Sequence, residues 1–417
     1  MRRREFLGLT ALASVAPLAR AAAKSVHAAP RVVIVGGGFG GSACALQLKR
    51  NDPSIEVTLI DPDDRYVTCP LSNEALVGLR SIASLTISRE GLQRADVRYV
   101  RARASAIDAE RRRVQLDTGR WLDFDRCVVS PGIRFLWNTP EGYDQAAAEH
   151  MPHAWKAGRQ TELLAARLHA IDDGGTVAIS VPAGLMRCPP GPYERASLIA
   201  EFLKRHKPRS KLVIFDSNNH FPRQDVFTAE WDAAYRGLIE WIPPTAGGTV
   251  VGVDAKRGIV RTSRGSQRFA LANIIPPQAP DALAVDAGLA SGHGWCPIHP
   301  LTFESQHVER VHVIGDACIA DAMPKSASAA VSQARQCAAA IAALFADRAP
   351  PEPEFDSVCY SLTAHDRALS IHGRFHVANG QIEAASTAES ETARDAAAEA
   401  ERAQAWYRKA VADCFDA

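Results

Sequence analysis

The stretch Arg-Val-Val-Ile-Val-Gly-Gly-Gly-Phe-Gly-Gly at residues 31–41 decides the fold of this chain. A β-branched run leads into a glycine-rich turn, and residues 43–49 then show helical periodicity. In such a unit Gly36 permits the tight turn, Gly38 lets the backbone approach a pyrophosphate, and Gly41 lets helix and strand pack closely. The pattern predicts a dinucleotide-binding unit.

A carboxylate at the expected distance supports this interpretation. Residues 56–60 form the next predicted strand, which ends at Asp61, 20 residues after Gly41. An acid in this place binds the ribose hydroxyls of an adenine dinucleotide. A glycine pattern alone is a weak signal, but with two strands and the acid it is a strong one.

Later strands continue the unit. The strand ending before Pro131-Gly132 is of the buried type, and a similar strand ends in Gly315-Asp316. In flavoproteins with two dinucleotide-binding domains, an aspartate in this place binds the ribityl chain, so these four residues are predicted flavin contacts. Lys325 could neutralise a reduced flavin or have only a structural role. The strands are predicted at residues 97–100, 111–116, 124–130 and 311–316.

A second unit of the same kind is predicted from strands at residues 176–181 and 211–215, with a helix at 194–204 between them. Its connecting turn, residues 184–192, contains three prolines. A nicotinamide dinucleotide would need glycines and free amides there, whereas proline removes donors and fixes the backbone. The second unit is therefore expected to keep the fold without binding NADH.

The sequence predicts an α/β fold with two dinucleotide-binding (Rossmann-like) domains and a C-terminal α+β capping domain that covers the flavin. The C-terminal part is expected to hold a few short strands and, at residues 384–404, a solvated helix or linker. The predicted parts are a leader (1–29), an FAD-binding domain in two pieces (30–150 and 274–349), the second domain (151–273) and the C-terminal domain (350–417).

The N-terminus resembles a twin-arginine export signal. Three arginines at residues 2–4 precede Phe6-Leu7 and an apolar run to Leu18, with small-residue cleavage options near residues 19–21. The run is too short to span a bilayer, and no C-terminal membrane anchor is evident. We expect a protein of the periplasm that is not inserted in a membrane.

The charge balance and the cysteines restrict the chemistry. A formal net charge of +1 does not indicate nucleic acid binding. The nine cysteines include no Cys-x-x-Cys-His and no Cys-x-x-Cys, so neither an attached haem nor a zinc or iron–sulfur site is expected. Electrons that leave a flavin must therefore pass to another molecule. Cys69 lies eight residues after Asp61, a position that places its thiol beside a bound flavin.

Six motifs resemble those of the flavoprotein subunit of flavocytochrome c sulfide dehydrogenase. The likeness extends from about residue 31 to the Trp-Tyr pair at 406–407. The motifs are Tyr-Val-Thr-Cys-Pro-Leu-Ser-Asn-Glu (66–74), Leu-Asp-Phe-Asp-Arg-Cys-Val-Val (122–129), Pro-His-Ala-Trp-Lys-Ala-Gly (152–158), Arg-Cys-Pro-Pro-Gly-Pro-Tyr-Glu-Arg-Ala-Ser (187–197), Gly-Trp-Cys-Pro (294–297) and Val-Ile-Gly-Asp-Ala (313–317).

The resemblance implies a thioether between Cys69 and the flavin, although Pro70 stands where an aromatic residue is expected. It also implies a disulfide between Cys188 and Cys359 beside the flavin, which sulfide attacks. A hydrosulfide can open such a disulfide, leaving a persulfide and a thiolate. Glu194 matches a proposed general base, although a plain first-turn acid is the alternative. Trp406 matches an aromatic residue that packs near the flavin, the alternative being an interface or core tryptophan.

The expected function is FAD-dependent oxidation of sulfide, with electrons passed to a c-type cytochrome on a separate chain of a heterodimer. One alternative is a sulfide:quinone oxidoreductase, and another is a non-catalytic flavoprotein accessory subunit of a sulfur-oxidising complex. A second possible redox pair, Cys296 and Cys318, stays open from the sequence. The other four cysteines, at positions 44, 127, 337 and 414, are interpreted as buried core residues.

Overall fold

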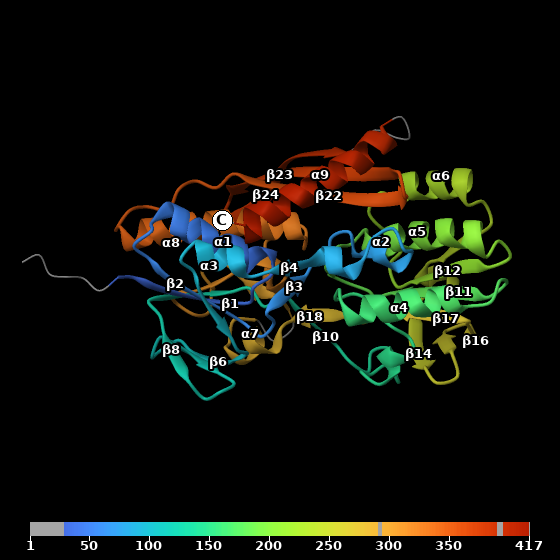
Figure 1. Cartoon of the computed structure of the whole chain (residues 1–417), viewed down its shortest axis with the longest axis horizontal. Coiled ribbons are helices and arrows are strands. Elements are labelled where there is room, and N and C mark those ends of the chain that lie inside the picture. The colour runs from blue at the N-terminus through green and yellow to red at the C-terminus, as the bar shows by residue number, and fades with distance from the viewer. Residues whose placement is uncertain (1–28, 291–293, 390–394, 417) are drawn as a thin grey trace, which may run out of the picture.

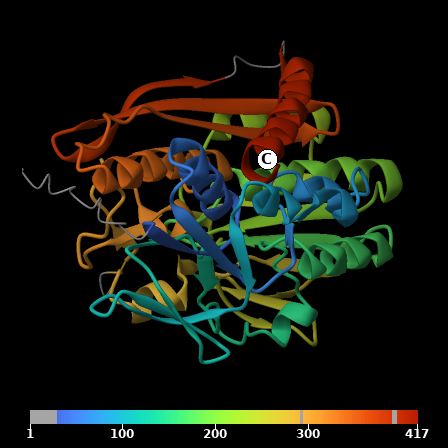
Figure 2. The same cartoon turned by 60° about the vertical axis from the view of Figure 1, so that its left-hand side comes forward.

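The computed structural model describes residues 29–290, 294–389 and 395–416. The predicted export signal thus lies outside the described residues, apart from Ala29. Figures 1 and 2 show two α/β units side by side, with the C-terminal segment lying across one face of both.

The first unit is built on a parallel five-stranded sheet with the order β20-β9-β1-β2-β5. Residues 32–35 of its central strand are all buried, as expected for a parallel sheet covered on both faces. The helices α1 and α8 pack against each other beside this sheet (Figure 1). These elements are β1 (Arg31–Val35), α1 (Phe39–Asn51), β2 (Glu56–Asp61), β5 (Arg98–Arg101), β9 (Arg126–Val129), β20 (Val311–Val313) and α8 (Ala327–Phe345).

Smaller elements surround this sheet. The antiparallel sheet β6-β7-β8 lies at its lower edge in Figure 1, and β10 pairs with β18. They are β3 (Arg65–Val67), α2 (Ser72–Leu76), β4 (Thr86–Ser88), α3 (Glu90–Arg94), β6 (Ala104–Asp108), β7 (Arg113–Leu116), β8 (Trp121–Asp123), β10 (Ile133–Phe135), β18 (Gln278–Pro280), α7 (Ala282–Asp286), β19 (Cys296–Pro297) and β21 (Cys318–Ile319).

The second unit repeats the pattern with a parallel four-stranded sheet of order β13-β12-β11-β17. Its long helix α5 begins with a proline in the first turn and ends with three basic residues, which suits the helix dipole. The elements are α4 (Arg159–Ala170), β11 (Thr176–Val181), α5 (Gly191–His206), β12 (Lys211–Asp216), α6 (Gln224–Ala234), β13 (Ile239–Ile242), β14 (Val250–Asp254), β15 (Ile259–Thr262), β16 (Gly265–Arg268) and β17 (Leu271–Ile274).

The C-terminal segment differs from the sequence prediction. In place of a few short strands it has an antiparallel sheet of three long strands, β22 (Phe355–Ala364), β23 (Arg367–Ala378) and β24 (Gln381–Glu389). The predicted helix or linker at 384–404 was wrong in its first part, which belongs to β24. The helix α9 (Ala396–Phe415) follows and buries one face, including Ala403 and Tyr407, so it is not simply solvated.

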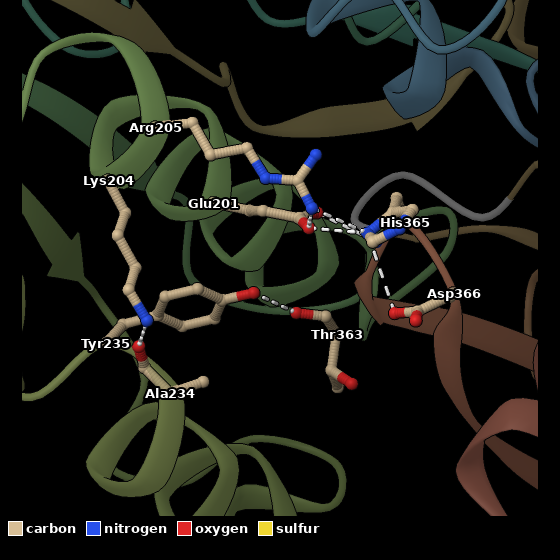
Figure 3. Close-up of polar contacts among 8 residues, drawn as sticks. All are labelled: Glu201, Lys204, Arg205, Ala234, Tyr235, Thr363, His365 and Asp366. Carbon is tan, nitrogen blue, oxygen red and sulfur yellow. Dashed lines mark hydrogen bonds and ion pairs between the residues drawn. The ribbon is translucent and has the colours of Figure 1, made fainter.

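A polar cluster holds the C-terminal sheet against α5 (Figure 3). Glu201 on α5 accepts a hydrogen bond from the His365 backbone amide at 2.7 Å and contacts the ring Nδ1 at 2.6 Å. Arg205, one turn later, donates to the Glu201 carboxylate at 2.6 Å. Tyr235 donates to the Thr363 carbonyl at 2.8 Å. Side chains of the second unit therefore fix the turn between β22 and β23, and with it the strand that carries Cys359.

Candidate active site

A cavity of about 1040 Å³ lies between the first sheet, the second unit and the C-terminal sheet. It extends from the glycine turn after β1 to residues of β22 and α9, and its size is at the upper end of known cofactor sites. The sequence-predicted site residues that line it are Gly36, Gly38, Asp61, Cys69, Pro131, Gly132, Cys188, Glu194, Gly315, Asp316, Cys359 and Trp406. The other two, Gly41 and Lys325, lie outside the lining.

The glycine turn requires glycine at two positions for different reasons. Gly36 has a φ of +95°, and a Cβ there would lie 2.2 Å from the carbonyl oxygen of Ser130. At Gly41, a Cβ would lie 1.8 Å from the Gly36 carbonyl oxygen. Gly41 therefore acts at the contact between helix and turn, while Gly36 shapes the cavity wall itself.

Replacing Gly41 with alanine is expected to destabilise the first unit by at least about 3 kcal/mol, because the atom it would strike is backbone and cannot move aside. The matched control is Gly40→Ala, whose Cβ would lie 2.7 Å from the rotatable Ser130 hydroxyl and at an ordinary contact distance of 3.6 Å from the Ala330 and Ile314 side chains. Thermal unfolding measures the stability of the two variants, and gel filtration measures how much bound dinucleotide each of them retains. Equal retention by the two variants would contradict the steric argument.

Asp61 is held at the end of β2 beneath the glycine turn. Its Oδ2 accepts a hydrogen bond from the Gly37 amide at 2.7 Å, and its Oδ1 pairs with Nη2 of Arg89 at 3.1 Å. Arg89, which the sequence analysis missed, is 4% exposed and also donates to the Gly37 carbonyl. The acid is thus fixed with its carboxylate at the cavity wall, where a ribose would be bound.

The two residue pairs predicted at the flavin lie at one sheet edge. Pro131-Gly132 follow β9 and Gly315-Asp316 follow β20, which is the neighbouring strand. Ligands bind at the carboxyl ends of parallel strands in such sheets. Burial raises the pKa of Asp316, and Nη1 of Arg187 lies 3.9 Å from its Oδ2, opposing that rise.

Lys325 lies beside the loop after β20, outside the cavity lining. Its ammonium group donates to the backbone carbonyls of Asp316 at 2.9 Å and Cys318 at 2.6 Å, and it lies 3.8 Å from the centre of the Trp295 ring. These contacts fix the loop after β20. Lys325 does not line the cavity, and its role toward a flavin stays a prediction.

Cys69 lies between β3 and α2, close to the C-terminal helix. The preceding Thr68 hydroxyl is 2.8 Å from the hydroxyl of Tyr407 on α9. Trp406, the neighbour of that tyrosine, lines the same cavity as Cys69, with its ring centre 6.2 Å from that of Tyr360 on β22. The C-terminal helix therefore closes the cavity next to the cysteine.

Cys188 and Cys359 come from distant parts of the chain and line the same cavity. Cys188 precedes α5 with a φ of +52°, and its amide donates to the Lys325 carbonyl at 2.8 Å. Both are free thiols in this structure. Burial is the main cause that raises both pKa values, that of Cys359 to about 11, and the Cys359 charge further raises the pKa of Cys188.

Glu194 lies in the first turn of α5, 8% exposed at the cavity wall. Its Oε2 accepts a hydrogen bond from Nδ2 of Asn73 at 2.7 Å, and its Oε1 accepts one from the Leu362 amide at 3.0 Å. Burial raises its pKa to about 7, while the two hydrogen bonds act in the opposite direction. A carboxylate with this pKa can both accept and return a proton near neutral pH.

A buried network that the sequence analysis missed supports this region. Arg195 donates to Oδ1 of Asn73 at 3.0 Å, to Oδ1 of Asn273 at 2.8 Å, and to the carbonyls of His153 and Ala154 at 2.9 and 2.7 Å. It thereby joins α2, α5 and the loop that follows residue 152. Arg195 and Asn73 both lie in motifs that the sequence analysis quoted for their cysteines.

Trp155 and Lys156 extend from that loop and also line the cavity. Trp155 is 6% exposed, and its indole Nε1 is buried without a hydrogen-bond partner among the described residues. Lys156 Nζ lies 5.6 Å from the centre of the Phe135 ring. Both residues belong to the motif at 152–158, which the sequence analysis quoted as similar to the family. The likeness therefore pointed to this segment, but neither residue was assigned a role.

The remaining cysteines lie outside the cavity lining. Cys296 and Cys318 are direct partners in the short parallel pair β19–β21, and burial raises the pKa of each to about 12. The two residues are neighbours across this pair of strands, and neither lines the cavity. The other four are buried in the first unit's core, as the sequence indicated: Cys44, Cys127, Cys337 and Cys414.

In the second unit, the acid that corresponds to Asp61 already accepts hydrogen bonds from other residues of the chain. Asp216 ends β12 and is fully buried, with Oδ2 accepting hydrogen bonds from the Tyr193 hydroxyl at 2.5 Å and Trp241 Nε1 at 2.9 Å. Its Oδ1 accepts from the Asn218 amide at 2.9 Å. This carboxylate cannot bind a ribose without losing internal partners, which agrees with the proline-rich turn before α5.

Across the part of the chain that the structure describes, no three His, Cys, Asp or Glu side chains are grouped as a metal site. Within the same residues, no helix has both the length and the apolar character needed to cross a membrane.

Three protein families match parts of the chain. Residues 30–165 match the pyridine nucleotide-disulphide oxidoreductase family. Residues 161–276 match the central domain of the sulfide dehydrogenase [flavocytochrome c] flavoprotein chain, and residues 351–415 match the flavin-binding domain of flavocytochrome c sulphide dehydrogenase.

Comparisons with individual proteins agree with these family matches. The chain is 60% identical over 43 residues to the sulfide dehydrogenase [flavocytochrome c] flavoprotein chain of Chlorobaculum thiosulfatiphilum, covering 90% of that sequence and 10% of this one. It is 21% identical over 313 residues to the mitochondrial sulfide:quinone oxidoreductase of Dictyostelium discoideum, covering 73% of this chain and 68% of that protein. The sulfide:quinone oxidoreductase structure from Aquifex aeolicus shares the fold, with a TM-score of 0.73 and 16% identity over 91% of this chain and 90% of that one.

Proposed function

This chain belongs to the flavoprotein family of flavocytochrome c sulfide dehydrogenase, and from that premise we propose that Cys188 and Cys359 form the redox-active disulfide that sulfide attacks. The chain is an FAD-dependent oxidoreductase that acts on sulfide. What supports the proposed disulfide is one observation: Cys188, Cys359 and Glu194 line a single cavity.

The residues of this cavity fit FAD. The glycine turn has no room for a Cβ at Gly36, Asp61 ends β2 at the cavity wall, and Trp155 offers a buried donor that has no partner among the described residues. In the proposal Gly38 and Asp61 hold the adenosine diphosphate part, and Asp316 holds the ribityl chain. When bound, FAD supplies a two-electron acceptor.

The chemistry of the two cysteines follows from thiol–disulfide exchange. A hydrosulfide ion attacks one sulfur, so that one S–S bond forms as another breaks, leaving a persulfide on one cysteine and a thiolate on the other. Glu194 takes the proton from hydrogen sulfide or from the persulfide. A second hydrosulfide ion, or a polysulfide ion, takes the outer sulfur and leaves as a persulfide or polysulfide, from which a sulfur product can form. The S–S bond between Cys188 and Cys359 would then form again as the remaining thiol proton is lost and two electrons pass to FAD.

Cys69 is proposed to be the covalent attachment point of FAD through a thioether. The support is the likeness of residues 66–74 to the family motif, together with the position of Cys69 in the lining of the cavity. A covalent bond prevents loss of a cofactor that cannot be replaced outside the cytoplasm.

The proposed electron acceptor is a c-type cytochrome on a separate chain. The family name implies such a partner, and this sequence has no Cys-x-x-Cys-His with which to attach a haem itself. Trp406 and Cys69 lie at the cavity wall near α9, so we propose that the partner docks close to that end of the cavity.

An anaerobic stopped-flow experiment tests the function. Sulfide is expected to bleach the flavin absorbance of the purified protein, and an oxidised soluble c-type cytochrome is expected to restore it at least about tenfold faster than a short-chain quinone at equal concentration. Faster restoration by the quinone would favour the sulfide:quinone alternative. Absence of bleaching by sulfide would favour the accessory-subunit alternative, and rapid bleaching by NADH would contradict the argument from Asp216.

Export by the twin-arginine route, and hence a periplasmic location, is also part of the proposal. Its support is the arginine-led apolar segment at residues 2–18. To test the export route, cells that express the full chain are fractionated and compared with cells that express a variant with lysines in place of Arg2 and Arg3. Unchanged export of the lysine variant would contradict the twin-arginine route.

A further inference from the structure

The side chain of Asn73 lies between the proposed proton acceptor and a buried cation. Its Nδ2 donates to Oε2 of Glu194 at 2.7 Å, and its Oδ1 accepts from Nε of Arg195 at 3.0 Å. All three residues are more than nine-tenths buried, with exposed fractions of 8%, 8% and 2% for Asn73, Glu194 and Arg195. The reaction described above uses Glu194 and assigns no role to the other two residues.

Arg195 sets the orientation of the Asn73 amide. A guanidinium group only donates hydrogen bonds, and the nitrogen of a side-chain amide cannot accept one. The oxygen of Asn73 must therefore face Arg195, and its NH₂ group must face Glu194. The flipped amide would place its nitrogen against the guanidinium and its oxygen against the carboxylate, and both hydrogen bonds would be lost.

Arg195 itself is fixed by neutral oxygen atoms. Its Nη1 donates to Oδ1 of Asn273 at 2.8 Å and to the His153 carbonyl at 2.9 Å. Its Nη2 donates to the Ala154 carbonyl at 2.7 Å. Burial lowers the pKa of this guanidinium to about 10, and Glu194 is the charge that most opposes that fall. The guanidinium is therefore a rigid support for the amide that lies between the two charges.

The second oxygen of Glu194 is also held by a donor. Oε1 accepts a hydrogen bond from the Leu362 amide at 3.0 Å, on β22, the strand that carries Cys359. Donors to both oxygens favour the ionised form of a carboxylate. Neither this amide nor the NH₂ group of Asn73 can accept a proton. A proton that Glu194 takes up therefore passes to neither neighbour and stays available for return to a group in the cavity.

We propose that Asn73 is a positioning residue for Glu194: its amide, oriented by Arg195, holds the carboxylate at the cavity wall and favours the ionised form that accepts a proton. This inference rests on the proposed role of Glu194. The proton leaves hydrogen sulfide or the persulfide and binds to the Glu194 carboxylate, while Asn73 keeps its own hydrogens and acts only through the hydrogen bond.

The ionisable groups around Glu194 set the direction of the expected pH effect. Burial raises the pKa of Glu194 to about 7, and its two hydrogen bonds oppose that rise. The charge of Glu74 on α2 also raises this pKa, and the charge of Arg195 lowers it. The thiols of Cys188 and Cys359 line the same cavity, and the Glu194 charge raises the pKa of each. Loss of the amide donor is therefore expected to leave Glu194 protonated up to a higher pH.

The first test follows the ionisation of Glu194 in the purified protein with its bound FAD. Asn73→Ala removes the donor, and Asn73→Asp keeps the size of the side chain and an acceptor for Arg195 while a carboxylate oxygen replaces the donor. In both variants the midpoint of the Glu194 titration is expected to rise by about one pH unit or more. The readout is the infrared carbonyl band of a protonated carboxyl group, assigned by its absence from Glu194→Gln.

The second test measures how fast sulfide bleaches the flavin. Because hydrogen sulfide ionises in the same range, the ratio of wild-type to variant rates is used. For Asn73→Ala this ratio is expected to be about tenfold at about pH 6 and to fall within about twofold at about pH 9, where Glu194 is ionised in both proteins.

The matched control is Asn273→Ala. It also removes an acceptor of Arg195, but Asn273 has no hydrogen bond to Glu194 among the described residues. This variant is expected to keep the wild-type titration midpoint and to give a rate ratio that is constant with pH. If Asn73→Ala fails to retain FAD, Asn73→Asp carries both tests, because it still offers Arg195 an acceptor.

The outcomes separate this inference from the proposed function. If sulfide bleaches the wild-type flavin and Glu194→Gln is impaired, but both Asn73 variants titrate as the wild type does, the role of Asn73 is overturned and the function stands. An equal rise of the midpoint in Asn273→Ala would also overturn it, because loosening of Arg195 would then explain the effect. A full bleaching rate in Glu194→Gln would overturn the proton acceptor itself, and with it the positioning role.

Discussion

Replacing Cys188 with serine is expected to lower sulfide oxidation by a factor on the order of 10³ or more while FAD stays bound. A hydroxyl cannot form a disulfide with Cys359, so hydrosulfide has no S–S bond to attack. The local fold should persist, because Cys188 is anchored through its backbone: its amide donates to the Lys325 carbonyl at 2.8 Å, and its carbonyl accepts from the Gly191 amide at 2.9 Å. Anaerobic bleaching of the flavin by sulfide measures the loss.

The matched control for this variant is Cys318→Ala, together with Cys296→Ala. These two cysteines are also neighbours, on paired strands, but they lie outside the cavity lining. Both alanine variants are expected to keep the wild-type bleaching rate. A non-reducing digest of wild-type protein should yield one linked pair of peptides that contains Cys188 and Cys359. Loss of bleaching in Cys318→Ala with retention in Cys188→Ser would show that the wrong pair had been chosen.

The parts of the fold that the sequence predicted well are those in which local pattern and tertiary structure agree. The glycine turn at 36–41 combines a positive φ with a close backbone contact, and only glycine satisfies both, so the sequence shows the structure directly. Buried parallel strands can also be recognised in the sequence as apolar runs, because both of their faces need apolar side chains. Residues 176–181, predicted as a strand, coincide with β11.

The C-terminal sheet was harder to predict for a physical reason. The outer strand β24 is rich in Ala, Ser, Thr and Glu, and most of the side chains described on it are exposed. It is a strand because it pairs with β23 over eight residue pairs, a long-range interaction that local propensity does not encode. The same residues taken alone resemble a polar helix, which explains the wrong prediction.

In the candidate site, too, some residues could be predicted from the sequence and others could not. Residues with a characteristic chemistry or motif, such as Cys188 and Asp61, could be selected from the sequence and do line the cavity. Residues that matter because of their partners could not be selected in this way. Arg195 and Asn73 are examples, because their hydrogen bonds join α2, α5 and the loop after residue 152. Lys325 is the converse case, because its ammonium group binds two carbonyls next to the cavity without lining it.

Replacing Glu194 with glutamine is expected to lower kcat/KM for sulfide by about 10²–10³ near neutral pH. Burial holds the pKa of this carboxyl at about 7, so in the wild-type protein the fraction that can accept a proton rises as the pH passes through that value. Glutamine accepts no proton at any pH, and its one carbonyl oxygen can replace the acceptor for Asn73 or for the Leu362 amide but not for both. The variant therefore loses one hydrogen bond as well as the proton acceptor, and the pH dependence is needed to separate the two effects.

The pH dependence separates a general base from a structural acid. Because hydrogen sulfide itself ionises in the same range, the ratio of wild-type to variant rates is measured from about pH 6 to pH 9 instead of either profile alone. If Glu194 removes a substrate proton, the ratio should fall at high pH, where sulfide arrives already ionised and no base is needed. Glu201→Gln is the control on the same helix, since its carboxylate contacts His365 and Arg205 outside the cavity lining. A constant ratio across the range, or the same ratio for both variants, would mean that Glu194 only supports the fold of α5. A ratio that falls for Glu194→Gln alone would identify this carboxylate as the proton acceptor beside the two cysteines.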